Sequence, residues 1–286
     1  MRELVVTVLD VHHWELRKLR RQRRTYLGLA FSAFAGLAFV VAILLGAPSP
    51  DVVYGSVVRS SGLTMPLIVL SYAARFGVGA LIVALVAGDI FAAEDQQRTT
   101  KTILTRSVGR SEIFLGKLLA SATYAVLVLV TMGVFALTAG VAAWGFNPLA
   151  TIAGGGEPPA VSRVRTLSAT AALGWVAAAH AVYLLPLLGF VAIALFLSAV
   201  TRNGVAAIVG TLMLAVALYG LVEAVGLHGG PAPYLLASHF DAWQGLLRPS
   251  PDWSIVGRAA WVCGLYAFVP LLAAWIYFKR RDVADD

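Results

Sequence analysis

The sequence is dominated by long apolar stretches that carry no charge. The stretch from Leu27 to Ala47, and again the stretch from Trp261 to Phe278, contain no Asp, Glu, Lys or Arg. A helix needs about 20 such residues to cross a bilayer, because the hydrocarbon is roughly 30 Å thick and each residue rises about 1.5 Å. Windows of this kind occur at 27–47, 67–93, 118–146, 172–200, 204–225 and 257–278. The sequence therefore predicts six transmembrane helices.

The composition agrees with a bilayer as the surrounding solvent. Of the 286 residues, 59% are hydrophobic and 13% are charged, whereas soluble domains are about half apolar and about a quarter charged. The windows lack the alternation of apolar and polar residues that spanning strands require. We therefore predict an all-α integral membrane protein with a single transmembrane domain over 1–286.

The Lys and Arg residues predict how the helices are oriented. Most of them precede the first window, lie between the second and third, or follow the last, and one lies between the fourth and fifth. These residues are Arg2, Arg17, Lys18, Arg20, Arg21, Arg23, Arg24, Arg98, Lys101, Arg106, Arg110, Lys117, Arg202, Lys279, Arg280 and Arg281. Loops rich in Lys and Arg stay in the cytoplasm, so we expect both termini there. The net charge of +7 then reflects topology and contact with lipid headgroups, and no nucleic-acid partner is expected.

Three segments outside the windows differ from the windows in composition and are not expected to cross the bilayer. Residues 3–24 combine apolar residues at helical spacing with a basic run, which predicts an amphipathic elbow helix on the membrane surface. It serves either as a topology anchor or as a brace against a cytoplasmic partner. Residues 147–171 read as a flexible outer loop, and residues 227–256, rich in Pro and Trp, as a re-entrant or surface segment on the outer side.

The cytoplasmic loop at 94–117 carries the clearest functional signal. It opens with acidic residues, continues with a short polar helix around Ile103 and Leu104, and passes through a Val-Gly-Arg turn. Such a segment can lie along the membrane surface and present residues 99–106 to another protein.

This loop resembles that of the membrane subunits of type-2 ABC exporters. In that family a Glu is followed by Gly-Thr, a basic residue, a Leu pair, a Pro-Val-Ser-Arg turn and a Lys. The residues that match, in order, are Glu94, Thr99, Lys101, Ile103, Leu104, Val108, Arg110 and Lys117. The sequence departs from the pattern at Arg98, Ser107 and Gly109, which stand where Gly, Pro and Ser are usual. The elbow, the six spans and the segment before the last span resemble the same family over essentially the whole chain.

The resemblance implies a permease subunit in the cytoplasmic membrane of an archaeon or bacterium. The loop would be a coupling helix that docks on a separate ABC ATPase, with two ATPases in each complex. A second copy of the chain, or a related permease, would complete the transporter. ATP and Mg would be used by the partner, because the Gly116-Lys117 pair of this chain is followed by Leu118, not by the Ser or Thr of a phosphate loop. No catalytic residue and no bound cofactor are expected in the chain itself.

Charged and titratable residues within the windows are further candidates, because such groups are costly in a bilayer. Arg75 either extends to the outer headgroups or lines a pathway. Asp89 either pairs with basic residues of the elbow or of the loop, or acts as a conformational latch. His180 is either a neutral histidine bonded to the backbone or a substrate or proton site. Scattered histidines and the single Cys263 predict no metal site.

Two other classes of function remain open. One is a membrane-embedded enzyme that acts on lipid or prenyl carriers, for which Asp89, Glu94 and Asp95 are the only gathered acidic groups. The other is a membrane scaffold that transports nothing, whose outer loops would be expected to be longer than those found here. The sequence does not identify a transported substrate.

Overall fold

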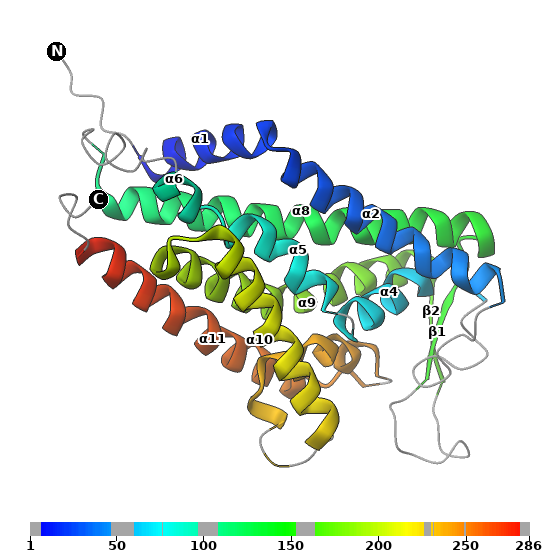
Figure 1. Ribbon diagram of the computed structural model, residues 1–286. Helices are drawn as coiled ribbons and strands as arrows, with labels where there is room; N and C mark the ends of the chain where they lie inside the picture. The colour runs from blue at the N-terminus through cyan, green and yellow to red at the C-terminus, as the bar shows by residue number, and fades with distance from the viewer. Residues whose placement is uncertain are drawn as a thin grey trace.

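A computed structural model of the protein describes residues 7–46, 60–75, 77–96, 108–152, 164–225, 230, 232–248 and 250–280. These residues form mostly helices, arranged as a bundle (Figure 1). Among them, the helices long and apolar enough to cross a membrane are α2 (Arg23–Leu44), α8 (Arg110–Trp144), α9 (Ala169–Thr201), α10 (Gly204–Val225) and α11 (Trp253–Arg280). The chain is therefore a multi-pass membrane protein.

The second predicted window is divided between two helices. Helix α4 (Thr64–Arg75) and the stretch Val78–Gln96, which starts with helix α5 (Val78–Ala87), are bent by 72° about a short break. Gly77, in the break, has a left-handed backbone with φ of 62°, a conformation that glycine adopts without a steric penalty. The described residues thus contain five candidate spans, or six if the bent pair counts as one span. The second window was expected as one helix over 67–93, and this expectation missed the break.

Helix α9 is the centre of the bundle. Within its most apolar stretch 61% of the residues are buried, against 22% in α10 and in α11. Helices α8, α10, α11 and α5 all pack on α9, and α2 packs on α8. The outer helices expose large apolar side chains, among them Phe34, Met213 and Trp261. Exposed apolar surface of this extent fits contact with lipid.

One end of the bundle gathers the basic residues of several elements, and we call it the basic end. It comprises α1 (Val8–Arg21), α6 (Ala92–Gln96), the first turns of α8 and the last turn of α11 (Figure 1). Helix α8 begins at Arg110 instead of near 118, and its 35 residues span roughly 52 Å. This length exceeds the hydrocarbon of a bilayer, so α8 projects beyond it.

Helix α1 lies against the start of α8. Thr7 and Asp10 form a capping box at its N-terminus, which satisfies backbone N–H groups that have no partner within the helix. Val11, Glu15 and Leu19 are its buried residues. Gly116 of α8 permits the approach, because a Cβ atom there would lie 2.5 Å from Cγ1 of Val11.

The opposite end of the bundle contains a pair of strands that the sequence did not predict and two 3-10 helices in the segment before the last span. The segment expected as a flexible loop includes an antiparallel pair, β1 (Leu149–Ile152) and β2 (Val164–Leu167), with Leu149 opposite Leu167. The part of the chain that the structure describes therefore includes a small two-stranded sheet besides its helices. The segment expected at 227–256 contains η3 (Ala232–Tyr234) and η4 (Leu236–Leu247), which are 3-10 helices. Trp243 of η4 is fully buried, and η4 packs on α9.

Candidate functional site

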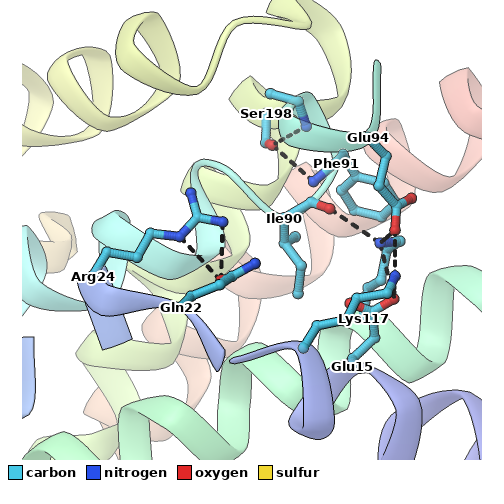
Figure 2. Close-up of polar contacts among 10 residues, drawn as sticks. Glu15, Gln22, Arg24, Ile90, Phe91, Glu94, Lys117 and Ser198 are labelled. Carbon is cyan, nitrogen blue, oxygen red and sulfur yellow. Dashed lines mark hydrogen bonds and ion pairs between the residues drawn. The ribbon is translucent and has the colours of Figure 1, made fainter. Parts of the chain in front are cut away.

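The turn that joins α5 to α6 is held by a serine from the central helix. Oγ of Ser198, in α9, accepts hydrogen bonds from the backbone N–H groups of Phe91 at 3.2 Å and Ala92 at 3.1 Å. These groups stand at the start of α6, where N–H groups lack partners within the helix. Ser198 is fully buried. The start of α6 is therefore fixed to α9 (Figure 2).

A buried lysine connects this turn to two further helices. The side chain of Lys117, in the second turn of α8, is only 1% exposed. Its Nζ donates to the backbone oxygen of Ile90 at 3.0 Å and lies 2.8 Å from Oε1 of Glu94 and 3.2 Å from Oε1 of Glu15. A buried ammonium is stable only when it is paired and hydrogen-bonded. Lys117 has both kinds of contact, and they join α8 to α1 and α6.

Lys18 completes a neutral network of two ammonium groups and two carboxylates. Its Nζ lies 2.6 Å from Oε1 of Glu94 and 2.8 Å from Oε1 of Glu15. Burial opposes the charged form of Lys18, but the charges of Glu94 and Glu15 outweigh it, so the pKa of Lys18 is raised above its ordinary value. Lys18 and Lys117 thus bridge the same two carboxylates, Lys18 from the solvent side and Lys117 from the interior. Figure 2 shows Lys117 between Glu15 and Glu94.

A second ion pair fixes the same turn to the first span. Arg24, at the start of α2, pairs with Asp89, and its Nε and Nη2 donate to Oε1 of Gln22 at 3.1 and 3.0 Å. Gly204, the first residue of α10, lies directly against the carboxylate of Asp89 and leaves no room there for a Cβ atom. The turn at 89–94 therefore contacts the ends of α1, α2, α8, α9 and α10. We call residues 89–94 the hub.

Aromatic packing adds the last helix to this arrangement. The ring of Phe91 lies 5.7 Å from that of Phe114 in α8 and 5.3 Å from that of Phe278 in α11. Arg110 donates to the backbone oxygen of Lys279 at 2.7 Å. The start of α8 and the end of α11 are thus held together beside the hub.

The structure brings some of the predicted site residues together and leaves others apart. Glu94, Asp89, Lys117 and Arg110 all lie at the basic end. Thr99, Lys101, Ile103 and Leu104 lie outside the described residues. Arg110 and Lys117 were expected in a loop over 94–117, but both belong to α8.

Arg75 and His180 do not join this site. Arg75 is exposed at the end of α4, beside the break before α5. His180 lies within α9, and its Nδ1 is 2.8 Å from the backbone oxygen of Val176. Its Nε2 is buried against Gly133 and has no partner among the described residues. This contact with the backbone corresponds to the first of the two alternatives predicted for His180, a histidine hydrogen-bonded to the backbone.

Sequence reasoning missed Glu15 and Ser198. Glu15 is spaced four residues from Val11 and from Leu19, so it interrupts an apolar stripe of α1. A carboxylate on such a stripe is a signal for a buried partner. Ser198 is one of several small polar residues in the spans, and no pattern marks it. Among the described residues no group of three or more His, Cys, Asp or Glu could hold a metal ion.

The comparison with known proteins gives a family and no function. No curated protein matches the chain. Residues 54–284 match the model of a family described as "Protein of unknown function (DUF2705)". Because this match covers most of the 286 residues, the chain belongs to that family.

Proposed function

We propose that the chain is the membrane subunit of an ATP-driven exporter of the type-2 ABC class. The observation that carries the proposal is the contact of 2.8 Å between Glu94 and Lys117. These two residues stand at the two ends of the segment that resembles a coupling loop. A force applied to that segment by a docked ATPase reaches the bundle through both ends at once.

The hub gives this force a route into the spans. Ser198, Arg24 and Lys117 attach the hub to α9, α2 and α8, and Glu15 of α1 shares the same network. Polar contacts to several helices from one short turn favour movement of these helices as a unit. This arrangement supports coupling between an ATPase at the basic end and a rearrangement of the bundle.

In this proposal, separate subunits bind ATP and enclose the transport pathway. ATP and Mg bind to two separate ABC ATPases, and residues 94–117 dock on them at the cytoplasmic face. Two permease chains, either two copies of this one or this one and a relative, enclose the transport pathway. The elbow α1 braces the docking segment through Glu15 and Lys18.

An enzyme acting on lipid or prenyl carriers is less well supported. Such an enzyme needs carboxylates that are free to hold a metal or to transfer a proton. Asp89 is paired with Arg24, and Glu94 is paired with two lysines. Of the three clustered acidic residues Asp89, Glu94 and Asp95, the first two are therefore already engaged in ion pairs.

Co-purification tests the docking step. The full chain is expressed together with the ABC ATPase encoded nearest to it, and the pair is purified through a tag on the ATPase. We expect the unaltered chain to be retained, Leu104→Asp to abolish retention, and the control Arg17→Gln, an exposed residue of α1, to leave it unchanged. A chain that is never retained, or equal retention of all three forms, would overturn the docking assignment.

A further inference from the structure

A cavity of about 420 Å³ opens between the corner of α1 and α2 and the corner of α5 and α6. Its cationic lining comes from Lys18, Arg21 and Arg24, its acidic lining from Glu15 and Glu94, and its apolar lining includes Leu19 and Val86. The cavity therefore joins positive charge to an apolar wall at the level where the first span begins. This combination matches the boundary between the headgroups and the acyl chains of a lipid.

The charges around the cavity leave one positive group in excess. Glu15 and Glu94 are matched by Lys117 and Lys18, and Asp89 is matched by Arg24. Arg21 is exposed and lines the cavity. Within the part of the chain that the structure describes, its side chain has no acidic partner. One guanidinium in excess is suited to one phosphate, which it can bind with two parallel hydrogen bonds.

The surface of α2 beyond the cavity is suited to an acyl chain. Arg24, Leu27, Phe31 and Phe34 follow one another at helical spacing and so share one face. Leu27 is 68% exposed and Phe34 is 63% exposed, and the rings of Phe31 and Phe34 stack at 6.4 Å. An apolar ladder thus starts one turn after the last arginine that lines the cavity.

We propose that this cavity binds an anionic phospholipid. The phosphate lies against Arg21, beside Lys18 and Arg24, and an acyl chain extends along Leu27, Phe31 and Phe34. A zwitterionic lipid is bound less tightly, because its own cationic group opposes the positive charge of the site. The inference does not depend on the proposed function, since it involves neither an ATPase nor residues 97–107.

The test compares lipids and variants on the full chain. The affinity of the first bound lipid is measured by native mass spectrometry in a neutral detergent, for phosphatidylglycerol and for phosphatidylcholine with the same acyl chains. We expect Arg21→Gln to weaken the binding of phosphatidylglycerol about fivefold, the factor that corresponds to the ~1 kcal/mol supplied by one Lys or Arg near an anionic surface. Arg17→Gln removes the same charge from the same helix outside the cavity, and it should have little effect.

Three outcomes would overturn the proposal. Equal affinity of the unaltered chain for the two lipids would exclude recognition of the anionic headgroup, whatever the variants do. If Arg21→Gln and Arg17→Gln weakened the binding of phosphatidylglycerol equally, the lipid would be responding to the general positive charge of the surface and not to this cavity. Displacement of phosphatidylglycerol by inorganic phosphate would assign the site to a free phosphate instead of a lipid.

Discussion

Replacing Lys117 by Met tests the buried network most severely. Met has nearly the same length and volume as Lys but no charge, so the change removes the ammonium and leaves the packing in place. Glu15 and Glu94 then face each other with Lys18 as their only cation in the network. Removing one partner of a buried ion pair costs about 3–5 kcal/mol. Because Lys18 still compensates part of the charge, we expect a loss of about 3 kcal/mol in the free energy of unfolding.

Lys18→Met provides the matched comparison. The side chain of Lys18 is 45% exposed, so solvent screens its charge, and pairs of this kind contribute about 1 kcal/mol or less. The double variant Glu15→Gln and Lys117→Met removes opposite charges together, and we expect it to be more stable than Lys117→Met alone.

The free energy of unfolding of these forms is measured by reversible unfolding in mixed micelles, with identical lipid and detergent. The predicted order is unaltered chain, Lys18→Met, the double variant, then Lys117→Met as the least stable. A Lys117→Met protein as stable as Lys18→Met would refute the reasoning, because it would mean that Lys117 is not held in a buried network. A double variant less stable than Lys117→Met would refute the assigned pairing with Glu15.

Three further changes probe other contacts. Ser198→Ala removes the acceptor of the first N–H groups of α6 and should lower the free energy of unfolding by about 1–3 kcal/mol, with faster hydrogen exchange of those amides. Gly204→Ala places a Cβ atom against Asp89 and should lower the melting temperature, whereas Gly220→Ala in the same helix, with open space around it, should not. Burial lowers the pKa of His239, so the stability that its neutral form supports is present above the unfolded pKa of about 6.5 and is lost as the pH falls toward the folded pKa. The pH dependence of the melting temperature should be weaker in His239→Gln, and an unchanged dependence would contradict this assignment.

The positions of the spanning helices were predictable from hydropathy, but their ends and breaks were not. A window average records the apolar character of 67–93 without recording the backbone, and the left-handed conformation of Gly77 divides that stretch. The start of α8 was placed too late because Lys117 is charged and was taken as a loop residue. In the structure three acceptor groups surround its ammonium, so the helix includes it.

The candidate site was predictable only in part, for a similar reason. Asp89 and Glu94 were recognisable as charges near the end of a span, whereas Lys117 was singled out only by the resemblance of the loop. Their partners come from distant parts of the chain, and Glu15 precedes Lys117 by 102 residues. No local pattern encodes such a pairing. The hydroxyl of Ser198 is equally hidden, because a serine in a span is more often bonded to its own helix.

ATPase activity in nanodiscs tests the proposed coupling of this chain to an ATPase most directly. The full chain and the ABC ATPase encoded nearest to it are assayed separately and together, first with the unaltered chain and then with Glu94→Gln. We expect activity to rise only when both proteins are present, and the rise to be smaller with Glu94→Gln, which weakens the contact with Lys117. ATPase activity that is the same with and without the chain would contradict the account.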